Sequence, residues 1–234
     1  NQQGIYDIYS GTYIDYVKKY LDHDAILMWE LGNEYNYNPQ WFGGNINNWY
    51  KAMNDASIKI QSIDKKRLVS SAHGDLPSKD ALEIGSSINI WGVNVYRWDE
   101  PASILSEWAE VSDKPIYFSE IGSDSYMTKS TKTYIKGINE VAQSDANKKI
   151  LNEILNKITL NEGVFIFQFA DGLWKAGNPS IQDKGGSAPN SDGTPYDGTA
   201  NEEYWGIVDI DRRKKTTFNA IKNAYSTINL KESN

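Results

Sequence analysis

Short apolar runs alternate with amphipathic helical patterns along this sequence, and this alternation constrains the fold more than any other feature. Runs short enough for strands buried on both faces lie at residues 25–31, 67–72, 88–96, 115–120 and 163–169. Apolar residues at helical spacing lie at 13–21, 49–60, 104–111, 138–158 and 218–228. Parallel strands need a crossover of about a dozen residues, which a helix supplies. The alternation therefore predicts an α/β fold built on a parallel sheet.

Two architectures satisfy this alternation. A doubly wound nucleotide-binding sheet would need a glycine-rich phosphate loop after its first strand, and neither G-x-G-x-x-G nor G-x-x-x-x-G-K-[ST] occurs in the sequence. In a (β/α)8 barrel, the chemistry lies at the carboxyl ends of the strands. Polar residues follow the expected strands at Asn33 and Glu34, His73 and Asp75, Asn94 and Tyr96, Glu120, and Asp171. We therefore expect a (β/α)8 TIM barrel.

Composition excludes several classes of function. A net charge of −7 and a pI near 5.0 argue against a nucleic-acid partner, because phosphate binding needs clustered lysine and arginine. The sequence has no cysteine and only two histidines, so it offers no thiolate and too few imidazoles for most metal clusters. No apolar stretch approaches the roughly 18 residues of a membrane span. We therefore expect a neutral partner and no cofactor, metal, membrane or nucleic acid.

The aromatic content suggests what that partner is. The sequence contains 8 Trp and 15 Tyr, more than an ordinary core requires. Flat rings with a polar edge suit the C–H faces of sugars. Extra core packing is the alternative interpretation of the same residues.

Two glutamates follow apolar runs and can meet when such a sheet closes. Glu34 comes just after the run at 25–31, and Glu120 ends the run at 115–120. Two carboxylates that face each other across a cleft can divide the work of glycoside hydrolysis, one as nucleophile and one as acid. The alternative for either glutamate alone is a helix cap or an ion pair with a lysine. Together they predict a glycosidase site.

Five segments, taken in order, resemble family-two glycoside hydrolases, which include the β-glucuronidases and β-galactosidases. They are similar to strands four, six, seven and eight and to the closing segment of that family's barrel. The segments are "WELGNE" (29–34), "GVNVYRW" (92–98), "KPIYFSEIGSDS" (114–125), "FQFADGLW" (167–174) and "YWGIVDIDRRKK" (204–215). The resemblance implies a retaining β-glycosidase of the clan that uses two glutamates.

The resemblance also implies a role for each matched residue. Glu34 would be the acid/base and Glu120 the nucleophile. Asn33 would hold the sugar 2-hydroxyl. Asn94 and Tyr96 match the family's N-x-Y on strand six, where Tyr96 would donate a hydrogen bond to the nucleophile.

Further residues are candidates for substrate binding. Asp171 follows the last expected strand, and Trp174 would stack under the sugar by the same resemblance. His73 and Asp75 could line the groove, although a solvated loop histidine is the alternative. Aromatic residues of the expected loops could provide secondary sugar platforms or pack locally, and these are Tyr35, Tyr37, Trp41 and Trp98.

The resemblance covers nearly the whole chain but only about five of the eight units of the barrel. The first three strand–helix units are not recognisable in the sequence. We therefore expect residues 1–234 to form a single catalytic barrel domain that is a fragment of a longer polypeptide. A preceding segment or a second chain would then complete the barrel.

The expected function is hydrolysis of β-linked oligo- or polysaccharides by a retaining double displacement. Two alternatives stay open: a non-catalytic carbohydrate-binding relic of the same barrel, and a scaffold protein with no sugar site. The compartment is not determined by the composition, with a secreted or periplasmic location favoured. The sugar, the linkage and exo or endo action are not specified.

Overall fold

The computed structural model describes residues 11–97, 100–157, 161–185 and 197–226. Its main helices are α2 (Thr12–Lys19), α3 (Asn47–Ile63), α4 (Lys79–Ile84), α5 (Ser103–Val111), α6 (Glu140–Leu155) and α7 (Thr216–Ser226). Its strands are β1 (Trp29–Asn33), β2 (Val69–Gly74), β3 (Ile90–Asn94), β4 (Ile116–Ile121), β5 (Tyr126–Met127), β6 (Gly137–Ile138) and β7 (Asn161–Ile166). Short 3-10 helices cover Tyr35–Tyr37, Pro39–Phe42 and Glu202–Tyr204.

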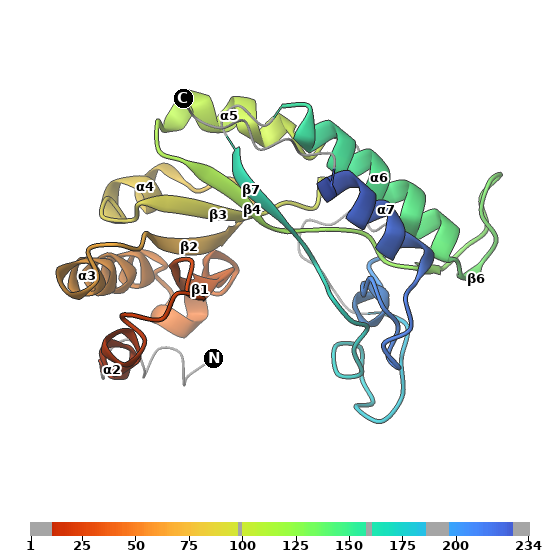
Figure 1. Ribbon diagram of the computed structural model, residues 1–234, viewed down its shortest axis with the longest axis horizontal. Helices are drawn as coiled ribbons and strands as arrows, with labels where there is room; N and C mark the ends of the chain where they lie inside the picture. Colours follow the sequence, from red (N-terminus) through yellow and green to blue (C-terminus); the bar gives the residue numbers. More distant parts are fainter. Residues whose placement is uncertain (1–10, 98–99, 158–160, 186–196, 227–234) are drawn as a thin grey trace. The chain divides into compact units, whose positions relative to one another are not determined.

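The main sheet has five strands in the order β1-β2-β3-β4-β7 (Figure 1). Strands β1 and β2 pair in parallel, as do β2 and β3, where Ala72 lies opposite Gly92. Helices separate successive strands of this main sheet along the chain, and the apolar pattern predicts all of them except α4 between β2 and β3. The α/β class and the parallel sheet are therefore confirmed.

The chain divides into two compact units. The first comprises residues 1–94, 104–119 and 160–163, and the second comprises 95–103, 120–159 and 164–234. The prediction that the chain is a single catalytic domain stays a prediction.

The first unit is built on strands β1 to β3. Every residue of β2 and β3 is buried, which is why these strands read as continuous apolar or small-residue runs. Helix α3 contacts α2, α4 and β2, and its buried face includes Trp49, Met53 and Ile60. Ser78 begins α4 as its N-cap by accepting a hydrogen bond from the Ala81 amide.

Strand β1 begins at Trp29, four residues later than the apolar run at 25–31 predicts. The buried guanidinium of Arg67 donates hydrogen bonds to the carbonyl oxygens of Leu21, His23 and Ile26. These bonds hold the segment before β1 as a loop. The later start of β1 cannot be read from the local pattern, because Arg67 lies 41 to 46 residues further along the chain than the carbonyl groups it binds.

The second unit contains the helix pair α6 and α7, which lie side by side (Figure 1). Asn139 caps α6 by accepting a hydrogen bond from the Ala142 amide. Strands β5 and β6 form an antiparallel hairpin that the apolar pattern does not predict, because each strand has only two residues. Within the described ranges, no helix is long and apolar enough to cross a membrane.

Candidate active site

Strand β1 ends in the candidate acid/base. Gly32 has a φ of +73°, and a side chain there would collide with the rings of Trp49 and Tyr35. Glu34 has a φ of 53° and a ψ of 27°, a left-handed conformation that non-glycine residues rarely adopt. Backbone strain of this kind concentrates at functional sites. The left-handed turn is therefore consistent with a functional role for Glu34.

Asn94, the last residue of β3, holds the end of β1. Its Nδ2 donates to Asn33 Oδ1 at 3.0 Å and to Glu34 Oε1 at 2.9 Å. Its Oδ1 accepts a hydrogen bond of 2.6 Å from Ser119 Oγ on β4. Asn94 is only 2% exposed, so its amide interacts mainly with protein groups. The structure thus brings three of the predicted site residues together.

In the second unit, Tyr96 holds the candidate nucleophile. Its hydroxyl donates a hydrogen bond of 2.8 Å to Glu120 Oε2, and the Val95 amide donates to the Glu120 carbonyl. The ring of Tyr96 packs edge-on against buried Trp205, with 5.0 Å between centroids. The structure therefore contains the hydrogen bond that the resemblance implies, and the tyrosine that makes it is fixed by packing.

Asp171 lies in a buried ion pair. Its Oδ1 accepts hydrogen bonds from Lys215 Nζ at 2.6 Å and from the Gly206 amide, and its Oδ2 accepts one from Gln182. Burial raises the pKa of Asp171, and the charge and hydrogen bond of Lys215 oppose that shift. Burial lowers the pKa of Lys215. These contacts give Asp171 a structural role, and its binding of substrate stays a prediction.

The predicted sugar platforms differ in exposure. Trp174 is 71% exposed, and Lys175 Nζ lies 4.9 Å from the centroid of its ring. Trp41 is 42% exposed and packs edge-on against Tyr35. Tyr37 instead lies against the backbone of Gly74, which leaves local packing as its evident role. Trp98 lies outside the described residues.

His73 belongs to the core of the first unit. Its Nδ1 lies 3.0 Å from the Gly74 carbonyl oxygen, so Nδ1 carries the proton, and Nε2 can accept from the Tyr50 hydroxyl at 3.2 Å. Burial lowers the pKa of His73 and favours the neutral ring. Asp75, two residues after His73, has a left-handed backbone conformation with a φ of 57°. This arrangement indicates a structural histidine.

A cluster of polar side chains from strands β1, β2 and β4 lies in the first unit. The Tyr117 hydroxyl donates to Glu30 Oε2 and lies 2.8 Å from Ser70 Oγ. Gly92 makes room for it, because a Cβ there would stand 2.8 Å from the Tyr117 ring. Burial raises the pKa of Glu30, and the bond from Tyr117 partly offsets this. The signal in the sequence is a glutamate inside an apolar run, which the pattern analysis missed.

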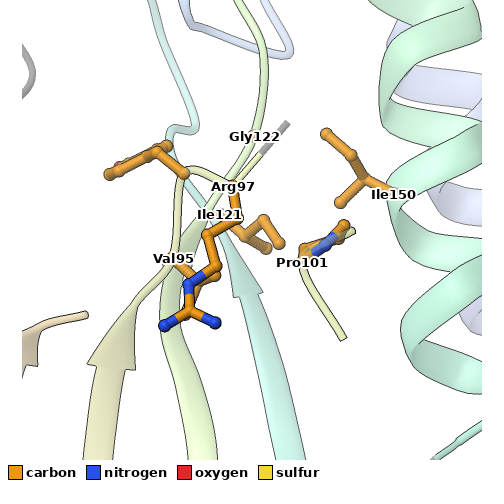
Figure 2. Close-up of a pocket in the computed structure, with 7 residues that line it drawn as sticks. Val95, Arg97, Pro101, Ile121, Gly122 and Ile150 are labelled. Atoms are coloured by element: carbon orange, nitrogen blue, oxygen red, sulfur yellow. The ribbon is translucent and has the colours of Figure 1, made fainter. Parts of the chain in front are cut away.

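A small cavity in the second unit is lined in part by Tyr96. Figure 2 shows its mostly apolar lining, which includes Val95, Pro101, Ile121 and Ile150. Its volume is about 10 Å³, room for a single water at most. Sugars need a far larger site, so this cavity is a packing defect.

No metal site is evident in the described parts of the chain. Within them, no group of three or more His, Asp or Glu residues could hold an ion.

Comparisons with known proteins bear on the fold. A β-galacturonidase of family GH2 from Eisenbergiella tayi is 22% identical, with a TM-score of 0.63 over 91% of this chain and 35% of that one. A Faecalibacterium prausnitzii β-glucuronidase is 20% identical, with a TM-score of 0.61 over 91% and 33%. The fold is part of a (β/α)8 barrel. The chain spans about a third of the length of these two proteins.

The same fold occurs in a smaller protein. A β-1,3-glucanosyltransferase from Rhizomucor miehei is 13% identical, with a TM-score of 0.59 over 87% of this chain and 68% of that one. No protein-family model matches the sequence, and no curated protein matches it. These structures are glycoside-processing enzymes, and at such identities they establish the partial barrel fold alone.

Proposed function

We propose that the chain is the catalytic part of a retaining β-glycosidase, with Glu34 as acid/base and Glu120 as nucleophile. One observation carries the proposal. A single short segment, residues 94–96, supplies a hydrogen-bond donor to each glutamate: Asn94 Nδ2 to Glu34 and the Tyr96 hydroxyl to Glu120. If the two glutamates were only helix caps or ion-pair partners, there would be no reason for neighbouring residues to orient both carboxylates. The glycosidase folds of the similar structures support the same conclusion.

The mechanism follows from two carboxylates with different tasks. Glu120 attacks the anomeric carbon while Glu34 protonates the departing oxygen, and a covalent glycosyl–enzyme intermediate forms. Glu34 then removes a proton from water, which displaces Glu120 and releases the sugar with its configuration retained. Retaining enzymes hold their two carboxyl groups about 5–5.5 Å apart. Within the first unit the Asn94 amide orients Glu34, and within the second unit the Tyr96 hydroxyl orients Glu120.

The proposed substrate is a β-linked oligo- or polysaccharide. Asn33 would bind the sugar 2-hydroxyl, Trp174 would stack on a ring face, and Asp171 would contribute a polar contact. The named activities of similar proteins range over galacturonide, glucuronide and β-1,3-glucan chemistry. That range, at low identity, supports a glycoside substrate and does not select one sugar.

We further propose that a preceding segment or a second chain completes the barrel. The described residues contribute five strands to the main sheet, whereas a closed (β/α)8 barrel has eight. A five-stranded parallel sheet leaves edge strands that favour association. Light scattering of residues 1–234 should show oligomers or aggregates, and a stable monomer with a sharp reversible unfolding transition would contradict this.

The two glutamates can be tested separately by product stereochemistry. Glu120→Ala removes the attacking group, so turnover should fall by several orders of magnitude, and added azide should give the α-glycosyl azide from the vacated face. Glu34→Ala should retain the covalent step with good leaving groups, and azide should give the β-glycosyl azide. Proton NMR of the products distinguishes these anomers.

The outcomes separate the alternatives. The opposite pair of azides would reverse the two roles, and undiminished turnover in both variants would exclude the carboxylate pair as the catalytic centre. A panel of aryl β-glycosides, with sugar-binding titrations alongside, decides the class of protein. Binding without turnover would indicate a carbohydrate-binding relic, and neither binding nor turnover would indicate a scaffold.

A further inference from the structure

Ser119, the residue before the proposed nucleophile, has no role in the chemistry described so far. It lies on β4, and its hydroxyl is 2.6 Å from Asn94 Oδ1. Through that amide it is linked to Glu34, whose Oε1 is 2.9 Å from Asn94 Nδ2. The three residues belong to the same compact unit.

We propose that Ser119 is a positioning residue for Glu34 and acts by fixing the orientation of the Asn94 amide. The inference rests on the proposed function, because it assigns to Ser119 a part in the acid/base step. The proposed role of Ser119 follows from which atoms of Ser119, Asn94 and Glu34 can donate and which can accept hydrogen bonds.

The amide of Asn94 has one useful orientation. Glu34 Oε1 accepts a hydrogen bond both when the carboxyl is ionised and when Oε2 carries the acid proton, so the NH2 end of Asn94 must face Oε1. The oxygen end then points at Ser119, whose hydroxyl can donate. A flipped amide would set its oxygen against the Glu34 carboxylate. Ser119 therefore stabilises the productive orientation by satisfying the opposite end of the amide.

Burial makes this arrangement matter. Asn94 is 2% exposed, so water cannot easily replace a lost partner. The same Nδ2 also donates to Asn33 Oδ1 at 3.0 Å. Loss of the Ser119 hydroxyl would therefore disturb both the proposed acid/base and the proposed ligand of the sugar 2-hydroxyl.

The neighbouring strand leaves space for this link. Gly92 stands two residues before Asn94 on β3, hence on the same face of the sheet. A Cβ at Gly92 would lie 2.9 Å from Ser119 Oγ, too close for a side chain to be accommodated without movement. The absence of a side chain at Gly92 lets the Ser119 hydroxyl reach Asn94.

The test is the dependence of kcat/KM on the leaving group in Ser119→Ala. Proton donation by Glu34 matters most for poor leaving groups, so an aryl β-glycoside with a weakly acidic phenol should lose about 10-fold, against about 2-fold or less for a dinitrophenyl glycoside. A role in general stability alone would lower both rates equally. Ser119→Thr keeps the hydroxyl and should restore the wild-type dependence.

Ser71→Ala is the matched control. Ser71 is a buried serine of the same sheet, and its hydroxyl donates 2.7 Å to the Leu31 carbonyl without contacting Asn94. It should leave the leaving-group dependence unchanged. If Ser119→Ala shows no more dependence on the leaving group than Ser71→Ala, the proposed role of Ser119 is overturned.

A second measurement is independent of turnover. In 1H–15N NMR spectra, the two Nδ2 protons of Asn94 should give separate signals that exchange slowly with water, and these should shift or broaden in Ser119→Ala but not in Ser71→Ala. Unchanged Asn94 signals in Ser119→Ala would overturn the inference. A wild-type chain without glycosidase turnover would instead count against the proposed function, and the NMR measurement would still decide whether Ser119 orients Asn94.

Discussion

The hydroxyl of Tyr96 donates a hydrogen bond of 2.8 Å to Oε2 of Glu120, and the ring that carries this hydroxyl packs against buried Trp205. A donor fixed in this way orients the Glu120 carboxylate. Tyr96, Glu120 and Trp205 all belong to the second compact unit.

Tyr96→Phe should therefore impair the first step of the reaction while the fold persists. A hydrogen bond to a charged group is worth about 1.5–3 kcal/mol, so kcat/KM should fall by about 10- to 100-fold. Tyr134→Phe is the control, because Tyr134 donates a similar bond of 3.0 Å to Asp145, which has no part in the proposed site. Equal kinetic effects in both variants would argue against a role for Tyr96 at the nucleophile.

The sequence predicts the sheet well because parallel strands buried on both faces are continuous apolar runs. Strand β3 lies within the run at 88–96, and β4 coincides with the run at 115–120 to within one residue at each end. The polar residues at strand ends also emerge from the sequence, since barrel enzymes place their chemistry there. The strands of the main sheet and their order along the chain therefore follow from local pattern.

Contacts between distant residues could not be predicted from local pattern. Ser119 reads as part of an apolar run, and only the approach of β3 shows that it meets Asn94. Lys215 reads as one of several lysines, although it is buried against Asp171. Helix α4 was missed because it has only six residues, of which only Ala81 is buried. In each case tertiary packing decides what the short segment does.

We expect the free energy of unfolding of the first unit to fall in acid because of Asp64. Its carboxylate accepts bonds from Trp29 Nε1 and Arg67 Nη1, each at 2.9 Å, and from the amides of Lys66 and Arg67. Burial alone would raise its pKa, but these bonds outweigh burial and lower it from 3.8 to about 2. The folded state thus favours the ionised form.

The direction of the pH effect follows. Because the pKa of Asp64 is lower in the folded state, its contribution to stability is complete above about pH 4 and is lost as the pH falls towards 2. The contribution is about 2 kcal/mol. Urea unfolding from pH 6 to pH 2 should show this loss in the wild type and not in Asp64→Asn. Asp24→Asn, at an almost fully exposed carboxylate, should behave as the wild type does.

The buried ion pair of Asp171 and Lys215 makes a separate prediction about the second unit. Each side chain is 3% exposed, and removing one partner leaves an unpaired buried charge. Lys215→Met should lower the free energy of unfolding by about 3–5 kcal/mol. The double variant Asp171→Leu with Lys215→Met should be less destabilised than Lys215→Met, because it buries no charge. Chemical denaturation checks this, and a double variant that is the least stable of all would contradict it.

Trp174 gives the prediction that separates binding from folding. Its ring is 71% exposed, so it contributes little to the core, whereas Trp205 is 1% exposed and packs against Tyr96. If Trp174 stacks on a sugar face, Trp174→Ala should raise KM by about 2- to 12-fold, which corresponds to the roughly 0.5–1.5 kcal/mol of an aromatic contact. The melting temperature should change little, because no buried contact is lost.

Trp205→Ala should instead unfold the second unit, since removing a buried tryptophan costs about 3–5 kcal/mol. Thermal unfolding and steady-state kinetics on both variants make the comparison. A Trp174→Ala variant with unchanged KM would remove this residue from the substrate site, and Trp41→Ala would then become the next platform to examine, because its ring is 42% exposed and is supported by Tyr35.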